Sequence, residues 1–265
     1  MNILKAIMIG DVVGEPGLKI LEEKLPDLIK DNAVDFTVVN GENTADGFGM
    51  TEAALKRITA CGADVVTSGN HVWEKRDFIP ILESNDNVLR PSNYPGKAAG
   101  RGWLCREKAG ITWLVINLQG REFMTPIDCP FRCFDNIINN LSNNEPKIIL
   151  VDFHAESSRE KEALGYYIDG RASLIVCTHT HVQTADERIL PKGTGYITDL
   201  GMTGNHDSVI GMDKKICIER SRRQILFRME PAAEKLTNGI SNAEVNGIIA
   251  EIDADTGKAI SIKRL

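Results

Sequence analysis

The chain alternates between short, nearly unbroken apolar runs and longer stretches in which apolar residues recur every three or four positions. The unbroken runs are rich in Ile, Val and Leu and end in Gly, Asp, Asn or His, a pattern typical of strands buried on both faces. We predict seven such strands, at residues 4–11, 34–43, 63–71, 111–120, 147–156, 173–181 and 193–201.

The stretches between these runs predict surface helices. In residues 17–32 the apolar positions fall close to a helical period, and Pro26 predicts a kink. Residues 51–62 begin with Thr51, a good helix cap, and end with Gly62. The predicted helices are residues 17–32, 51–62, 76–85, 129–144 and 158–170.

The C-terminal third changes character. Residues 215–230 and 247–265 are predicted as strands, and the DADTG turn at 253–257 predicts a hairpin. No internal repeat, low-complexity tract or linker divides the sequence. We therefore predict a single α/β domain over residues 1–265, with strands inside, helices outside and a β-rich C-terminal part.

Charge and cysteine content narrow the functional classes. The chain has 31 Lys and Arg against 37 Asp and Glu, with no dense basic block, which disfavours an extended nucleic-acid surface. A small polyanion can still bind at a locally positive site. The first apolar run is interrupted by Lys5 and is too short for a signal peptide or a membrane span, so we expect a cytoplasmic protein. The six cysteines contain no C-x-x-C pair, and we expect free thiols.

Side chains that can bind metals or transfer protons follow the predicted strands. In open α/β sheets, sites form beyond the carboxyl ends of the strands. Of the first six runs only 111–120 ends otherwise, in Gln119. Each residue alone also fits a turn, a cap or a core histidine, so the ordered set indicates a site. The set is Asp11, Glu42, Asn43, Asn70, His71, His154, His179 and His181.

The T-H-T-H stretch at 178–181 favours two metal ions over one. In an extended chain, residues two apart point the same way at a separation of about 6.6 Å. His179 and His181 so placed cannot share one small ion without a bend in the chain. Each can reach one of two ions, which in dinuclear sites lie about 3.5–4 Å apart.

These residues, in this order, resemble the calcineurin-like metallophosphoesterases. The matching segments are G-D-V-V (10–13), N-G-E-N (40–43), G-N-H-V-W-E (69–74), F-H-A-E (153–156) and T-H-T-H (178–181). Val13 stands where that superfamily has a His, and Glu42 followed by Asn43 stands in place of its bridging Asp. With these departures, and with longer segments such as GDVVGEPG and GRASLIVCTHTHVQTADERILPKGTGYITDLGMTG, nearly the whole chain resembles the bacterial 2′,3′-cyclic-nucleotide 2′-phosphodiesterases.

The resemblance implies a four-layer α/β/β/α sandwich and a role for each matching residue. Glu42 would bridge two metals, and His71 would be the proton donor. One metal would be bound by Asp11, Glu42, Asn43 and His181, and the other by Glu42, Asn70, His154 and His179. In the TGNHD segment, Asn205 and His206 depart from the family pattern, and we expect His206 to be structural or superficial.

The proposed ligands include only two carboxylates, so two divalent ions leave a positive core that attracts a phosphodiester despite the net charge of −6. Oxygen and imidazole ligands suit Fe, Mn, Co or Zn. The resemblance implies iron, with manganese as the alternative.

The resemblance implies hydrolysis of 2′,3′-cyclic nucleotides or other small phosphodiesters. A metal-bound hydroxide would attack phosphorus while His71 protonates the departing ribose oxygen. Two alternatives stay open: a phosphomonoesterase such as a nucleotidase or protein phosphatase, and a slow regulatory nucleotide-binding protein. The sequence also leaves a homo-oligomer open. Arg90, Arg121 and Phe123 are candidate pocket residues, and residues 199–203 are a candidate backbone wall beside the metals.

Overall fold

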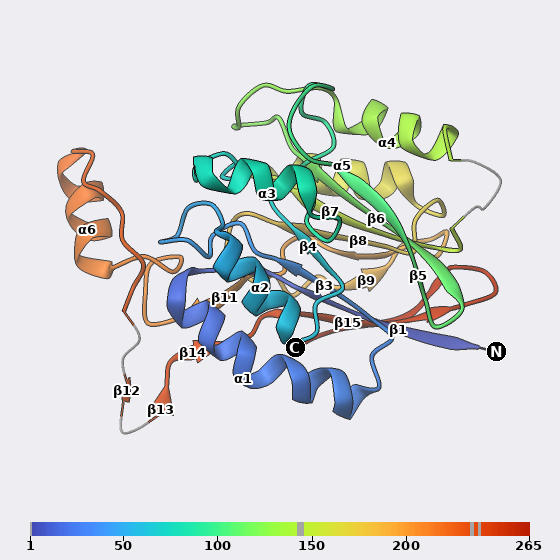
Figure 1. The fold of residues 1–265 in the computed structure, drawn as a ribbon, viewed down its shortest axis with the longest axis horizontal. Helices are drawn as coiled ribbons and strands as arrows, with labels where there is room; N and C mark the ends of the chain where they lie inside the picture. The colour runs from blue at the N-terminus through green and yellow to red at the C-terminus, as the bar shows by residue number, and fades with distance from the viewer. Residues whose placement is uncertain (1, 142–145, 234–235, 238–239) are drawn as a thin grey trace.

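The computed structural model describes residues 2–141, 146–233, 236–237 and 240–265. Two sheets lie face to face between helices (Figure 1). The first sheet has the order β16 (Ala259–Arg264), β15 (Gly247–Asp253), β1 (Ile3–Ile9), β3 (Phe36–Asn40) and β4 (Val65–Thr67). The second has the order β5 (Trp103–Lys108), β6 (Ile111–Gln119), β7 (Ile148–His154), β8 (Leu174–Thr178), β10 (Gly195–Ile197) and β9 (Arg188–Ile189).

Most strands in the middle of the two sheets are parallel, so their carboxyl ends lie at the same edge of each sheet. Strands β1, β3 and β4 are parallel in the first sheet, and β6, β7, β8 and β10 are parallel in the second. Strands β15, β16, β5 and β9 pair antiparallel. A small third sheet contains β14 (Ala243–Glu244), β11 (Met202–Asn205) and β2 (Asp11–Val12), and β12 (Leu236–Thr237) pairs with β13 (Ile240–Ser241).

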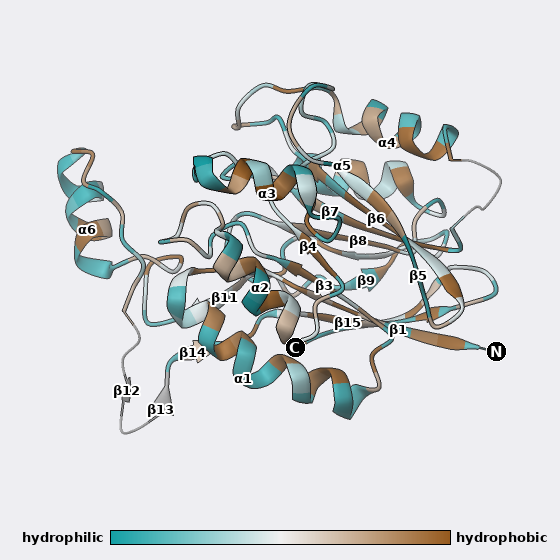
Figure 2. Ribbon diagram, in the orientation of Figure 1, coloured by the Kyte–Doolittle hydropathy of each residue, from teal (hydrophilic) through white to brown (hydrophobic). Residues whose placement is uncertain are grey.

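Three apolar clusters hold four layers together. Alternate residues of a strand face opposite sides, so Met8 of β1 points to the cluster between the sheets while Ile7 and Ile9 point to the helices. Between the sheets, the rings of Phe36 and Trp113 stack with centroids 4.7 Å apart. Figure 2 shows the apolar residues concentrated on the strands and on the inward helix faces. The predicted α/β/β/α sandwich is therefore confirmed.

The helices cover the two outer faces. The first sheet is covered by α1 (Gly14–Asn32), α2 (Glu52–Ala60) and α3 (Ile79–Ser84), the last preceded by the 3₁₀ turn η1 (Arg76–Phe78). The second is covered by α4 (Pro130–Asn139) and α5 (Ser158–Ile168). Helix α1 runs through Pro26, and Thr51 caps α2 by accepting from the Ala54 N–H. The end of the helix predicted at 129–144 lies outside the described residues.

One predicted strand is wrong. Within 215–230 the structure forms helix α6 (Lys214–Arg223), and residues 224–230 join no sheet in the described part of the chain. Asp213 caps this helix by accepting from the Lys215 and Ile216 N–H groups. Pairs of Glu219 with arginines three and four positions later also favour a helix. The helix cap and these ion pairs outweigh the short apolar runs that suggested a strand.

The other C-terminal prediction is confirmed. Strands β15 and β16 form an antiparallel hairpin whose turn contains Gly257 in the left-handed region, at φ 70°. The sequence did not predict edge strand β5. All six cysteines are free thiols. No helix in the described residues is both long enough and apolar enough to cross a membrane.

Candidate metal centre

The predicted site residues meet at one end of the sandwich because each follows a strand of the parallel sets. Asp11 follows β1, and the loops after β3 and β4 carry four more side chains. His154 is the last residue of β7, and the two remaining histidines follow β8. The structure thus brings together Asp11, Glu42, Asn43, Asn70, His71, His154, His179 and His181.

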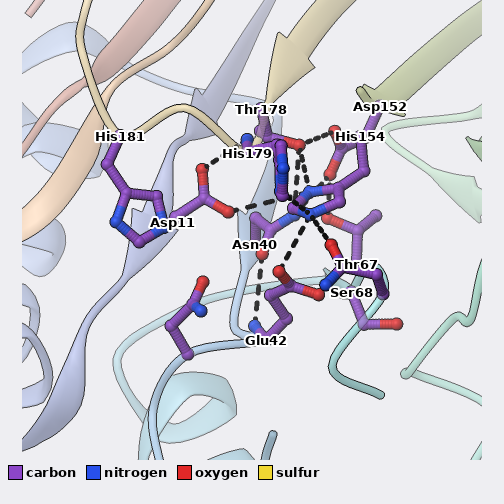
Figure 3. Close-up of polar contacts among 12 residues, drawn as sticks. Asp11, Asn40, Glu42, Thr67, Ser68, Asp152, His154, Thr178, His179 and His181 are labelled. Carbon is purple, nitrogen blue, oxygen red and sulfur yellow. Dashed lines mark hydrogen bonds and ion pairs between the residues drawn. The ribbon is translucent and has the colours of Figure 1, made fainter. Parts of the chain in front are cut away.

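His154 is the centre of the first group. Its Nε2 lies 2.9 Å from Glu42 Oε1, 3.0 Å from Asn70 Oδ1 and 3.0 Å from His179 Nδ1. One ligand atom from each of Glu42, His154 and His179 lies within 4.8 Å of the others. Figure 3 shows these side chains pointing toward one another. Four potential ligand atoms therefore converge on a small volume.

A buried network fixes the orientation of His154. Its Nδ1 lies 2.9 Å from Thr178 Oγ1, and that hydroxyl donates to Asp152 Oδ1 at 2.8 Å. The other Asp152 oxygen accepts from Thr67 Oγ1 at 2.5 Å and from Asn40 Nδ2 at 3.0 Å. Outer contacts of this kind orient a ligating imidazole and hold its second nitrogen toward a metal.

The second group lies around Asp11. Asp11 Oδ2 accepts from the His179 N–H at 3.1 Å, whereas Oδ1 is buried and has no hydrogen-bond partner among the described residues. Asn43 donates through Nδ2 to the Gly47 carbonyl, and its buried Oδ1 likewise lacks a partner within the described ranges. His181 Nδ1 donates to the Ile210 carbonyl at 2.8 Å, which leaves Nε2 as an acceptor. Figure 3 shows Asp11 between His181 and the His154–His179 pair.

This donor set fits metal ions. Carboxylate, amide and imidazole acceptors face one another, and two buried oxygens lack donors in the part of the chain that the structure describes. Buried polar atoms left in this way cost free energy unless a cation or a proton joins them. The backbone at Gly69 also lies close to two of these side chains. A Cβ there would lie 2.2 Å from His154 Cδ2 and 2.4 Å from Glu42 Oε2.

The proton affinities reflect the same concentration of acceptors. Burial raises the pKa of Asp11 to about 6. Burial also acts to raise the pKa of Glu42, but His154 and the His71 N–H outweigh it and lower that pKa to about 2. Burial opposes the charged form of His154, yet Glu42 and Asp11 raise its pKa to about 9. Burial and the neighbouring His154 lower the pKa of His179 to about 3. The site thus favours one extra positive charge beside Glu42.

His71 lies beside the ligand groups and lines the cavity that lies over the site. Its backbone N–H donates to Glu42 Oε2 at 3.1 Å. Its Nδ1 lies 3.5 Å from Glu74 Oε1, and its ring meets Phe48 edge-on at 4.9 Å between centroids. The imidazole is therefore anchored near the ligands while its side chain keeps 24% of its surface exposed.

The T-H-T-H geometry differs from the extended chain that we predicted. Strand β8 ends at Thr178, and both His179 (φ 104°) and His181 (φ 66°) have positive φ. Between them, Thr180 donates through its N–H and its hydroxyl to Asp199 Oδ2 at 3.1 and 2.7 Å. The resulting turn directs His179 to His154 and His181 to Ile210. The predicted role of residues 199–203 as a backbone wall overlooked the Asp199 side chain.

The other pocket candidates lie elsewhere. Arg90 is buried and donates to backbone carbonyls, including that of Pro91, and Arg121 contacts Glu160. Phe123 is 87% exposed, and His206 is exposed beside Asn246. The cavity over the site, about 1100 Å³ in volume, is lined instead by residues that the sequence did not single out, notably Phe48, Arg220, Phe227 and Arg228. Because 215–230 was predicted as a strand, no sequence signal placed its side chains at the site.

Comparison with known proteins agrees with this picture. A family model described as YmdB-like protein matches residues 7–265. The chain is 44% identical over 262 residues to the 2′,3′-cyclic-nucleotide 2′-phosphodiesterase of Bacillus subtilis (strain 168), covering 99% of this chain and 96% of that protein.

Two solved structures also match over nearly their full length. A novel phosphatase from Mycoplasma pneumoniae is 32% identical with a TM-score of 0.91, covering 100% of this chain and 93% of that one. A hypothetical protein from Thermus thermophilus is 36% identical with a TM-score of 0.88, covering 99% and 98%. The chain therefore belongs to the family of YmdB-like proteins.

Proposed function

We propose that the protein is a metal-dependent phosphodiesterase that hydrolyses 2′,3′-cyclic nucleotides to 3′-nucleotides. The observation that carries this proposal is the convergence of Glu42, Asn70 and His179 on the Nε2 atom of buried His154. The activity of the Bacillus subtilis relative, 44% identical over 99% of the chain, supports the choice of substrate.

The two groups of side chains would hold two divalent ions that share Glu42. Asp11, Asn43 and His181 would complete one set, and Asn70, His154 and His179 the other. Such ions supply Lewis acidity and a water of lowered pKa. We propose iron as the native metal, with manganese as the substitute, because the family resemblance implies it. Oxygen and imidazole ligands with no thiolate among them suit both ions.

The chain itself supplies the proton for the leaving group. In the hydrolysis, the oxygen of one water forms a bond to phosphorus, the bond from phosphorus to the 2′ oxygen breaks, and the water loses one proton to the solvent, from which His71 regains its own proton after each turnover. His71, on the cavity wall, gives a proton to the 2′ oxygen, which would otherwise leave as a poor alkoxide. The phosphate stays on the 3′ oxygen as a monoester. Free thiols at all six cysteines fit a cytoplasmic enzyme.

The test is the initial rate of 2′,3′-cyclic AMP hydrolysis by manganese-loaded protein, with the product isomer identified by phosphorus NMR. We expect 3′-AMP. Formation of 2′-AMP would contradict the proposed leaving group.

A second candidate, a phosphomonoesterase, is favoured by the match to the Mycoplasma pneumoniae phosphatase. Release of inorganic phosphate from AMP without turnover of the cyclic nucleotide would support it.

A further inference from the structure

Residues 213–231, which we call the α6 arm, form one side of the cavity. Gln224 reverses the chain after α6 with φ 55°, and the Asp213 N–H donates to the Glu230 carbonyl where the arm returns. Figure 1 shows α6 standing apart from the sandwich, beyond the end at which β1 finishes. Met212, the residue just before the arm, packs on the loop after β3, since a Cβ at Gly47 would lie 2.5 Å from Met212 Cε. The arm is therefore anchored beside the metal ligands.

The arginines of the arm divide into two kinds. Arg220 and Arg228 line the cavity, and neither forms an ion pair with a carboxylate in the described part of the chain. Arg220 Nη1 donates to the Phe227 carbonyl at 3.0 Å, which fixes the turn of the arm. In contrast, Arg222 and Arg223 bind Glu219 at 3.0 and 2.6 Å and do not line the cavity. Arg220 and Arg228 are therefore the arginines of the arm that an anion in the cavity can contact.

Most acidic residues of the cavity wall have cationic or imidazole partners. Asp46 lies 3.4 Å from Lys75 Nζ, and Glu156 lies 3.1 Å from His179 Nε2. Glu74 lies 3.5 Å from His71 Nδ1. Glu230, at the end of the arm, also lines the cavity. Arg220 and Arg228 on this wall can bind an anion, because a guanidinium donates parallel hydrogen bonds to phosphate oxygens.

A cyclic mononucleotide has no second phosphate for these arginines to bind, because its single phosphate is the one that reacts at the metal ligands. A chain of nucleotides offers a second phosphodiester on the 5′ side of the terminal ribose. The cavity, about 1100 Å³, has room beyond the metal ligands, and its aromatic side chains Phe48 and Phe227 can stack on bases.

We propose that the α6 arm binds this second phosphate, so that the preferred substrate is an oligoribonucleotide ending in a 2′,3′-cyclic phosphate. This inference rests on the proposed function and names its substrate class. Arg228 and Arg220 hold the phosphate between the last two nucleotides, and Phe227 packs on the penultimate base. The proposed site takes up only one further nucleotide, so that binding needs no extended basic track.

The experiment compares 2′,3′-cyclic AMP with the dinucleotide ApA that ends in a 2′,3′-cyclic phosphate, using the manganese-loaded full chain. We expect kcat/KM to be at least about tenfold higher for the dinucleotide, and Arg228→Gln to lower the ratio of the two values about tenfold, as for one charged hydrogen bond. The KM for the dinucleotide should also depend less on salt concentration in this variant, because one screened charge interaction is lost. Arg222→Gln removes the same charge from the arm away from the cavity and should leave the ratio unchanged.

Three outcomes would overturn the arm proposal: equal kcat/KM for both substrates, an unchanged ratio in Arg228→Gln, or an equal fall in Arg222→Gln. Failure of the proposed function looks different, because neither substrate then turns over. In that case the arm is tested by binding alone, with fluorescence anisotropy of labelled ApA 3′-phosphate. The arm proposal requires this probe to bind more tightly than labelled 3′-AMP, and the advantage to be lost in Arg228→Gln but kept in Arg222→Gln.

Discussion

The ammonium group of Lys161 lies 2.7 Å from the carboxylate of Asp199, and both side chains are 1% exposed. The same Asp199 oxygen accepts both hydrogen bonds from Thr180, the residue between His179 and His181. A buried ion pair thus joins α5 to the segment after β10, and its carboxylate determines the shape of the turn after β8. This links the packing of an outer helix to the geometry of the site.

Lys161→Met should be strongly destabilising. It leaves the buried Asp199 carboxylate without its cation, which costs about 3–5 kcal/mol of the free energy of unfolding. Urea denaturation followed by circular dichroism measures the change. Lys56→Met is the matched control, because Lys56 pairs with Glu52 at 2.6 Å on an exposed helix face and should cost less than about 1 kcal/mol. Equal losses in the two variants would show that the buried pair has no special role.

Gly69→Ala should weaken metal binding. The added Cβ would lie 2.2–2.4 Å from atoms of His154 and Glu42, so these ligands must move. We expect manganese affinity, measured by isothermal titration calorimetry, to fall about 10–100-fold, the range seen when ligand orientation is lost. Gly96→Ala is the control, since a Cβ there meets no atom within 4 Å. Unchanged affinity in Gly69→Ala would argue against Glu42 and His154 as ligands.

His71→Ala should slow hydrolysis of 2′,3′-cyclic AMP about 10²–10⁴-fold while both metals remain bound. The loss should be much smaller with bis-p-nitrophenyl phosphate, because p-nitrophenolate departs without a proton. Metal content measured by mass spectrometry separates loss of the acid from loss of the site. A similar loss on both substrates would instead assign His71 to binding.

Arg57 predicts a pH-dependent contribution to stability. Hydrogen bonds from Arg57 lower the pKa of both Glu15 and Glu22 below the ordinary value of 4.5. Carboxylates with depressed folded-state pKa values stabilise the fold above pH 4.5 and lose this effect as the pH falls through those values. Arg57→Leu should therefore cost up to about 1 kcal/mol at pH 7, with solvent screening keeping it small, and less at pH 3. Urea denaturation at both pH values checks this, and an equal loss at pH 3 would assign the effect to packing.

The sequence predicted the positions of the site because the ends of parallel strands meet at one edge. Apolar runs located β1, β3, β4, β7 and β8, and the polar residue after each run was enough to mark the ligand candidates. The turn at 179–181 could not be predicted in this way. Its positive φ values depend on Asp199, which reaches Thr180 only after β10 pairs with β8.

Helix α6 shows a second limit. Residues 216–218 and 225–227 are short apolar runs that suggested a strand, but in the structure several of these residues are exposed, including Ile218, Ile225 and Leu226. The apolar pattern predicts burial in a sheet only where a sheet edge is available. The cap at Asp213 and the Glu219–arginine pairs determine the local structure instead. Consequently the arginines of the cavity could not be found from the sequence.

The pairing of β1 with β15 has a consequence for biosynthesis. The register joins Ile3 to Asp253, so β1 has to wait for a strand made much later in synthesis before its antiparallel side is covered. Until then the nascent chain carries an open, apolar strand edge that invites association with other chains. Contacts so distant in sequence also slow folding. The first sheet is thus completed only once β15 has been made, and chaperone contact would be most useful in the period before that.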